Sequence, residues 1–252
     1  MKQLAEILGG WNPGEVHGLA WLKARGMTSM QAYRHFKEGN LQRIGSGIYA
    51  RPLDKLKWAG AVSAMQWEFR LPFHVAGQSS LELRGSSHNI RMARPEITLV
   101  TYKNRNLPAW VLSNDWGVDF KLNRSKLFSG DVWLEEINIA GMTIAVSSRE
   151  LAILEVINET TFDQSFEAME NLLLGLMTMR WEILQKLLEG CTSVKVKRVF
   201  LYLSEKLSMP YFERIDQSCI DLGKGPREVI RGGKMAEKYL ITVPLEAEES
   251  QF

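Results

Sequence analysis

Eight residues near the N-terminus carry side chains that can bond bases or phosphates. These residues are Thr28, Ser29, Gln31, Arg34, His35, Arg43, Ser46 and Arg51. Arginine can bond guanine bidentately, glutamine can bond adenine, and histidine or threonine can reach a base edge or a phosphate. Such side chains suit a DNA groove when a helix and a hairpin present them together, although they also suit an ordinary solvated surface.

The elements that must position these residues are predicted by helix signals. Thr28-Ser29-Met30-Gln31 fits a capping box and opens a helix that ends at Gly39. A preceding helix is expected from Pro13, capped by Asn12, to Gly26, and a shorter one over residues 2–9. Two helices joined by a turn that contains glycine form a helix-turn-helix.

A glycine-rich hairpin is expected after the third helix. Gly45-Ser46-Gly47 can turn between extended segments at residues 40–44 and 48–50, which would form a wing. At 100° per residue, the helix wheel places Met30, Tyr33 and Phe36 on the core side. The polar side would then face a major groove, while the wing would contact phosphates or the adjacent minor groove.

Charge is concentrated at one end of the chain. The net charge is only +2 over 252 residues, but residues 1–57 hold nine Lys or Arg against four Asp or Glu. This asymmetry is typical of a nucleic-acid-binding module, and also of a solvated face. The apolar runs are too short for a membrane span and no targeting segment is evident, so a cytoplasmic protein is expected.

The rest of the chain predicts an α+β fold with three parts: a winged helix-turn-helix domain over residues 1–57, a linking helix over 58–71, and a larger domain over 72–252. Strands are expected at residues 73–75, 96–102, 109–112, 132–139 and 142–146, with a hairpin at Ala140-Gly141. Helices are expected at residues 53–69, 151–158, 162–177, 180–188 and 193–207.

Two further basic clusters are candidates for a second polyanion-binding surface. One lies in the last long helix and the other surrounds C-terminal glycines; together they comprise Lys195, Lys197, Arg198, Lys224, Arg227, Arg231, Lys234 and Lys238. They would neutralise phosphates of DNA, or of the RNA or nucleotide that a partner acts on, or they would bind nothing.

Several of these segments resemble the AbiEi family of antitoxins. Residues 39–52 are similar to its wing pattern G-x-L-x-R-(I/V)-x-x-G-x-Y, and residues 71–85 to its P-x-H-x-G-G-x-(S/T)-A-L-E-L-x-G segment, with Ala76 and Ser80 departing from it. Residues 223–227, 232–234 and 238–244 resemble its C-terminal signature. The resemblance spans nearly the full length, while residues 110–190 match only in pattern.

The resemblance implies the antitoxin of a type IV toxin-antitoxin pair, associated with abortive infection and phage defence. An N-terminal winged helix would bind inverted repeats of double-stranded DNA in its own promoter and repress the operon. The C-terminal domain would oppose a nucleotidyltransferase-like toxin without a stable complex.

Catalysis, cofactors and metals are not expected from the residues. Gly77-Gln78-Ser79-Ser80-Leu81 lacks the second glycine of a nucleophile elbow, and Gly225 to Lys234 does not fit a Walker loop. Four scattered histidines and two cysteines do not make a metal site. Two alternatives remain: a repressor whose larger domain serves dimerisation or effector sensing, and, less favoured, a nucleic-acid-processing enzyme.

Overall fold

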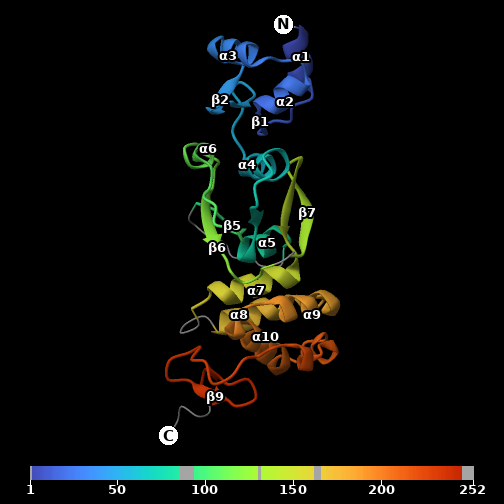
Figure 1. Ribbon diagram of the computed structural model, residues 1–252, viewed down its shortest axis with the longest axis vertical. Coiled ribbons are helices and arrows are strands. Elements are labelled where there is room, and N and C mark those ends of the chain that lie inside the picture. Colours follow the sequence, from blue (N-terminus) through green and yellow to red (C-terminus); the bar gives the residue numbers. More distant parts are fainter. Residues whose placement is uncertain (1, 86–93, 130–131, 162–165, 246–252) are drawn as a thin grey trace. The chain divides into compact units, whose positions relative to one another are not determined.

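The computed structural model describes residues 2–85, 94–129, 132–161 and 166–245 (Figure 1). The chain forms two compact units. Unit 1 comprises Met1–Val75, Arg91–Arg124 and Glu135–Val146, and unit 2 comprises Ala76–Ile90, Ser125–Leu134 and Ser147–Phe252. Helices and strands are mixed in both units, and the sheets are small, which confirms the α+β class.

Unit 1 begins with a winged helix. Its elements follow in the order α1 (Lys2–Gly9), β1 (Val16–Gly18), α2 (Leu19–Ala24), α3 (Ser29–Lys37), β2 (Gln42–Gly45) and β3 (Ile48–Ala50). The three strands form an antiparallel sheet in the order β1-β3-β2. Trp11, Leu22, Ala32 and Tyr49 lie in one buried cluster, so the three helices and the wing share a core.

The predicted helix from Pro13 to Gly26 is wrong in its first half. Asn12 does not cap a helix; its side chain donates to Glu15 Oε1 at 2.9 Å within a turn. Residues Val16–Gly18 are a strand, β1, which pairs with β3 so that Val16 lies opposite Ala50. Because strand pairing with a distant segment outweighs local helix preference, α2 begins only at Leu19.

The linking helix begins at Trp58, where the predicted link starts, and not at residue 53, where the helix pattern is expected to begin. Leu53 has φ 61°, which a helix does not allow, and α4 runs from Trp58 to Ser63. It continues as a π-helix, η1 (Ala64–Glu68). The buried Gln66 side chain bonds both the N–H and the carbonyl of Ala145, so η1 is fastened to the sheet that follows.

A mixed five-stranded sheet completes unit 1. It comprises β4 (His74–Val75), β5 (Glu96–Thr101), β6 (Asp119–Arg124), β7 (Leu134–Ile139) and β8 (Met142–Ser147), in the order β6-β5-β4-β8-β7. Strands β5 and β6 run parallel, as Figure 1 shows. The turn between β7 and β8 has φ 52° at Ala140 and 89° at Gly141, which confirms the predicted hairpin.

Two predictions for this sheet fail. The segment Ala109–Leu112, expected as a strand, is a short helix, α6. Its first residue follows Pro108, whose fixed φ suits the start of a helix turn. Strand β6 is absent from the prediction because its alternation, with side chains that are partly or fully exposed throughout, carries little apolar signal.

Unit 2 is mainly helical. Its helices are α5 (Gly77–Leu83), α7 (Arg149–Glu159), α8 (Phe166–Leu174), α9 (Trp181–Gly190) and α10 (Val194–Lys206), and the short elements are η3 (Phe212–Arg214), η4 (Gln217–Cys219), β9 (Lys234–Ala236) and β10 (Ile241–Val243). Ser148 and Ser193 accept backbone N–H bonds at the starts of α7 and α10, as capping residues. The predicted start of α8, residues 162–165, lies outside the described residues.

None of the helices in the described parts of the chain has the length and apolar character that a membrane span requires.

Candidate nucleic-acid interface

The third helix of the winged helix is fixed by the predicted capping box. The Gln31 backbone N–H donates to Thr28 Oγ1 at 3.2 Å, and the Thr28 backbone N–H donates to Gln31 Oε1 at 2.7 Å. At the other end, Gly39 has φ 75° and its N–H donates to the Phe36 carbonyl. Both ends of α3 are therefore defined by local bonds, which holds the helix rigid.

The exposed face of α3 differs from the one the sequence predicts. Ala32 is fully buried, whereas Met30 is 82% and Tyr33 47% exposed, so these two do not pack in the core. Arg34 is also exposed, with its Nε 3.8 Å from Glu38 Oε1, and Lys37 is exposed next to it. Met30, Tyr33, Arg34 and Lys37 stand at i, i+3, i+4 and i+7, so they form one outward stripe, which we call the α3 face.

Three of the candidates also make contacts within the winged helix, and their role in DNA binding stays a prediction. Gln31 and Thr28 are engaged with each other in the capping box, so their side chains support the helix. His35 is mostly buried, and its Nδ1 lies 3.4 Å from Glu38 Oε2. Ser29 and Arg34 are exposed, as the sequence predicts. The spacing of Met30, Tyr33 and Lys37 with Arg34 was the signal that could have identified the α3 face.

The wing carries one exposed cation and one structural one. Arg43 is exposed and its Nε donates to the Gly45 carbonyl at 3.2 Å; Ser46 is exposed at the tip. Arg51 instead donates to the Trp11 carbonyl at 2.8 Å and lies 3.6 Å from Asp54, so it joins the wing to the helices. Helix α6 packs directly against the wing at Gly45. A Cβ added at Gly45 would lie only 2.7 Å from the Trp110 Cβ, so the contact leaves no room for a side chain.

A buried charge cluster fixes the start of α2. His17 Nδ1 bonds Glu68 Oε2 at 2.9 Å, His17 Nε2 lies 3.4 Å from Glu15 Oε2, and the Gly18 N–H donates to Glu68 Oε1 at 2.7 Å. Burial opposes the charged imidazole, but the bonds to Glu15 and Glu68 outweigh it and raise the pKa of His17 above its usual value. The ring stacks on Trp21, with centroids 3.8 Å apart.

Part of the second basic surface is buried. Lys197 is 4% and Arg198 2% exposed, so these two residues cannot form the polyanion-binding surface that the sequence suggests. The Arg198 guanidinium donates to four backbone carbonyls, those of Leu222, Gly223, Gly225 and Leu240, at 2.7 to 3.2 Å. Arg198 points inward from α10, and its hydrogen bonds therefore hold the glycine-rich C-terminal segment in place.

The remaining basic residues are on or near the surface of unit 2. Lys195 donates to the Thr160 carbonyl at 3.4 Å, and Lys238 forms an ion pair with Glu205. The side chains exposed around the glycines are those of Lys224, Arg227, Arg231 and Lys234. Arg198 therefore anchors a loop whose outer side carries four cations.

The segment that suggested a hydrolase has structural roles. Gly77 has φ 52° and donates its N–H to Glu155 Oε2 at 3.0 Å at the start of α5. Ser80 is fully buried and donates to the Ser147 carbonyl at 2.6 Å. Within the described ranges, no three His, Cys, Asp or Glu side chains gather into a possible metal site.

The first part of unit 1 is a winged helix, and helix-turn-helix folds of this kind are common in DNA-binding proteins. Residues 1–92 match the AbiEi antitoxin N-terminal domain, and residues 94–244 match the family described as "Transcriptional regulator, AbiEi antitoxin, Type IV TA system". The chain therefore belongs to the AbiEi family of antitoxin transcriptional regulators of type IV toxin-antitoxin systems, which confirms the resemblance.

A solved structure shares the fold. The RV2827C protein from Mycobacterium tuberculosis aligns with a TM-score of 0.53 and 14% sequence identity, covering 90% of this chain and 85% of that chain. No curated protein matches the chain.

Proposed function

We propose that this antitoxin binds inverted repeats of double-stranded DNA in its own promoter and represses its operon. The α3 face would enter the major groove, with Arg34 on a guanine and Met30 or Tyr33 against thymine methyl groups. Arg43 and Ser46 would bond the phosphates beside it. The proposal places the chain in the cytoplasm, and repression of a promoter needs no catalytic step.

The observation that carries this proposal is the α3 face itself. A helix whose ends are both capped exposes Met30 and Tyr33 next to Arg34 and Lys37. Large apolar side chains that are exposed next to each other on one helix face are a feature of interaction surfaces. Their combination with two cations suits a groove that is lined by base edges and bordered by phosphates.

The proposal is tested by titrating a fragment of the chain's own promoter in a gel-shift assay. We expect Arg34→Ala to cost about 1 to 3 kcal/mol and to relax sequence preference. Arg43→Ala should weaken all sequences alike and reduce the salt slope by about one. Lys103→Ala removes an exposed cation of unit 1 outside the winged helix and is the matched control. Normal binding by both arginine variants would refute the groove assignment.

The antitoxin activity is assigned to residues 72–252, with residues 1–57 reserved for DNA and 58–71 as the link. We infer that the exposed cations around the C-terminal glycines oppose a nucleotidyltransferase-like toxin without a stable complex. Four cations on one anchored loop suit the phosphates of a nucleotide or RNA that the toxin uses. Growth assays with the toxin co-expressed beside Lys224→Ala/Arg227→Ala test this assignment.

A second candidate function is a repressor that senses a small effector. It is favoured by a cavity beside His17, lined by residues of α2 and of the linking helix. Its discriminating result is a promoter affinity that changes with a small molecule while toxin neutralisation is absent.

A further inference from the structure

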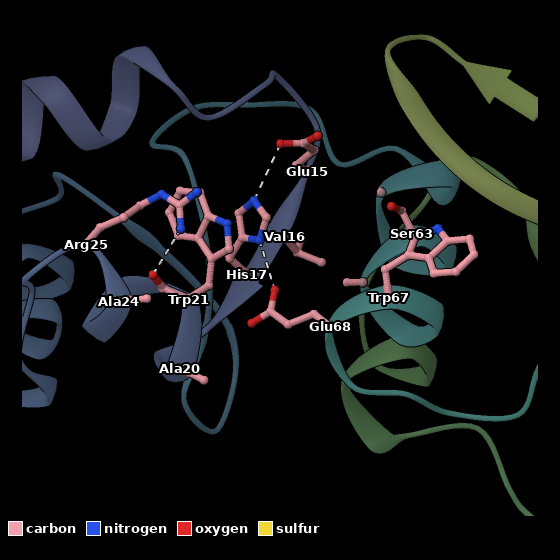
Figure 2. A pocket seen from close by; sticks show the side chains of 12 residues that line it. Glu15, Val16, His17, Ala20, Trp21, Ala24, Arg25, Ser63, Trp67 and Glu68 are labelled. Carbon is pink, nitrogen blue, oxygen red and sulfur yellow. Dashed lines mark hydrogen bonds and ion pairs between the residues drawn. The ribbon is translucent and has the colours of Figure 1, made fainter.

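A cavity of about 390 Å³ lies within unit 1 between the winged helix and the linking helix (Figure 2). Val16 of β1 and Ala20 of α2 line one side, and Ser63 of α4 and Trp67 of η1 line the other. Its volume suits a small organic ligand, since such sites are concave and mostly apolar with a few polar groups. Part of the wall is a π-helix, which occurs frequently at functional sites.

The polar groups of this cavity include charges of both signs. Glu15 and Glu68 are carboxylates, Arg25 carries a guanidinium, and the imidazole of His17 lies between the two carboxylates. Figure 2 shows His17 joined to both glutamates. Because carboxylates and a guanidinium face the same cavity, an anion or a cation would meet a like charge there, which favours an uncharged molecule.

Trp67 offers an open aromatic surface. It is 37% exposed, and its indole N–H already donates to the Thr143 carbonyl at 2.9 Å. Among the described residues, no aromatic ring or cation stacks on it, whereas Trp21 is stacked by His17 and by Arg25, whose Cζ lies 3.6 Å from the ring. Because its N–H is already bonded, Trp67 can contact a ligand through the face of its ring, and a second flat ring can stack there.

The glutamates accept hydrogen bonds only. An ionised carboxylate has about four acceptor positions, and Glu68 uses bonds from Gly18 and His17. A ligand that carries an N–H group can donate to one of the acceptor positions that remain on Glu68.

We propose that this cavity binds a neutral, planar aromatic molecule with an N–H donor, which stacks on Trp67 and donates to Glu15 or Glu68. This inference rests on the proposed function in one respect, because the ligand would act by changing the affinity of the chain for its promoter. Occupancy touches α2, which leads through a short turn into α3, and also η1, so ligand and DNA affinities are linked.

The test uses the full chain without DNA, with indole as probe in isothermal titration calorimetry. The control ligand is 1-methylindole, which keeps the ring and lacks the N–H. We expect 1-methylindole to bind about tenfold more weakly, as the loss of one hydrogen bond to a charged group predicts. Equal affinity for the two molecules, or no binding of indole, overturns the proposal.

Two variants locate the ligand. Ser63→Trp fills the cavity without removing a charged group, and we expect it to abolish measurable indole binding. Trp67→Leu should weaken indole about fivefold. Trp133→Leu, a half-buried tryptophan of unit 2, is the matched control and should leave affinity unchanged. Unchanged binding by Ser63→Trp, with a wild-type circular dichroism spectrum, places indole elsewhere and refutes the site.

A separate arm tests the effector role by titrating the promoter fragment with saturating indole present and absent. A change of threefold or more supports it, and an unchanged affinity contradicts it. If the chain does not bind its promoter at all, the proposed function fails while the calorimetry without DNA still decides whether the cavity is a binding site.

Discussion

His17 is the residue whose charge state couples most directly to stability. Its pKa is raised in the folded chain, so the proton binds the folded state more tightly than the unfolded one. The stabilisation is therefore complete below an unfolded pKa of about 6.5 and is lost as pH rises through the folded value. We expect His17→Gln to lower the free energy of unfolding by about 1 to 2 kcal/mol more at pH 6 than at pH 9.

Urea denaturation at both pH values measures this difference. The comparison between pH values removes the apolar packing of His17 on Trp21, so what remains is the contribution of the charged ring to its contacts with Glu15, Glu68 and the Trp21 face. Repeating the pair in a Glu68→Gln background gives a double-mutant cycle in which the pH-dependent difference should shrink. Parallel pH profiles for wild type and His17→Gln would contradict a charged histidine.

Arg198 is the second residue that carries a structural charge. Four of its five N–H donors bond four carbonyls of the segment between Leu222 and Leu240. We expect Arg198→Met to cost about 3 kcal/mol, because an apolar side chain leaves those carbonyls unbonded. Limited proteolysis should then cut within residues 222–240. Lys224→Met, an exposed control on the same loop, should stay within about 0.5 kcal/mol of wild type.

At the scale of elements, the capping box at the start of α3 gives a testable prediction. Thr28→Ala removes the oxygen that accepts the Gln31 N–H and should cost about 1 kcal/mol in thermal or urea unfolding. Ser29→Ala lies next to it, exposed and outside the capping box, and should be nearly neutral. A Thr28→Ala protein as stable as Ser29→Ala would show that the capping box adds nothing.

Elements with local chemistry are the ones the sequence predicts well. The capping box at Thr28, the serine cap at Ser148 and the hairpin at Ala140 depend on residues within one turn of each other, so a single chain segment contains the whole signal. Strand β1 and helix α6 were missed because β1 depends on pairing with β3, and the apolar run of α6 fits a strand equally well locally.

The face of α3 shows the limit of apolar periodicity in a short helix. The helical wheel predicts that the large side chains of Met30 and Tyr33 face the core. In the structure the buried residue of α3 is the small Ala32. The helix packs closely on a core that already holds Trp11, Leu22 and Tyr49, where little room is left for a large side chain. Of the eight predicted contact residues, five are exposed, namely Thr28, Ser29, Arg34, Arg43 and Ser46. Gln31, His35 and Arg51 are partly buried and also make contacts within the winged helix, and the DNA contacts of all eight stay a prediction.

At the scale of the whole molecule, the family motifs are mostly structural. Gly77 and Ser80 of the central motif bond residues of the neighbouring helix and strand, and the C-terminal glycines are held by Arg198. Positions that fix the backbone are thus separate from the side chains proposed to bind DNA or to oppose the toxin. We therefore expect the two proposed activities to be separable by substitution, since their proposed surfaces belong to different units.

This separation gives the last prediction. Arg34→Ala/Lys37→Ala should lose promoter binding in the gel-shift assay yet still rescue growth when the toxin is expressed from an independent promoter. Lys224→Ala/Arg227→Ala should do the reverse, because its substitutions lie in unit 2 and leave the α3 face intact. All four side chains are exposed, so each double variant should melt close to the wild-type temperature. Loss of both activities in either stable variant would mean that one surface serves both partners.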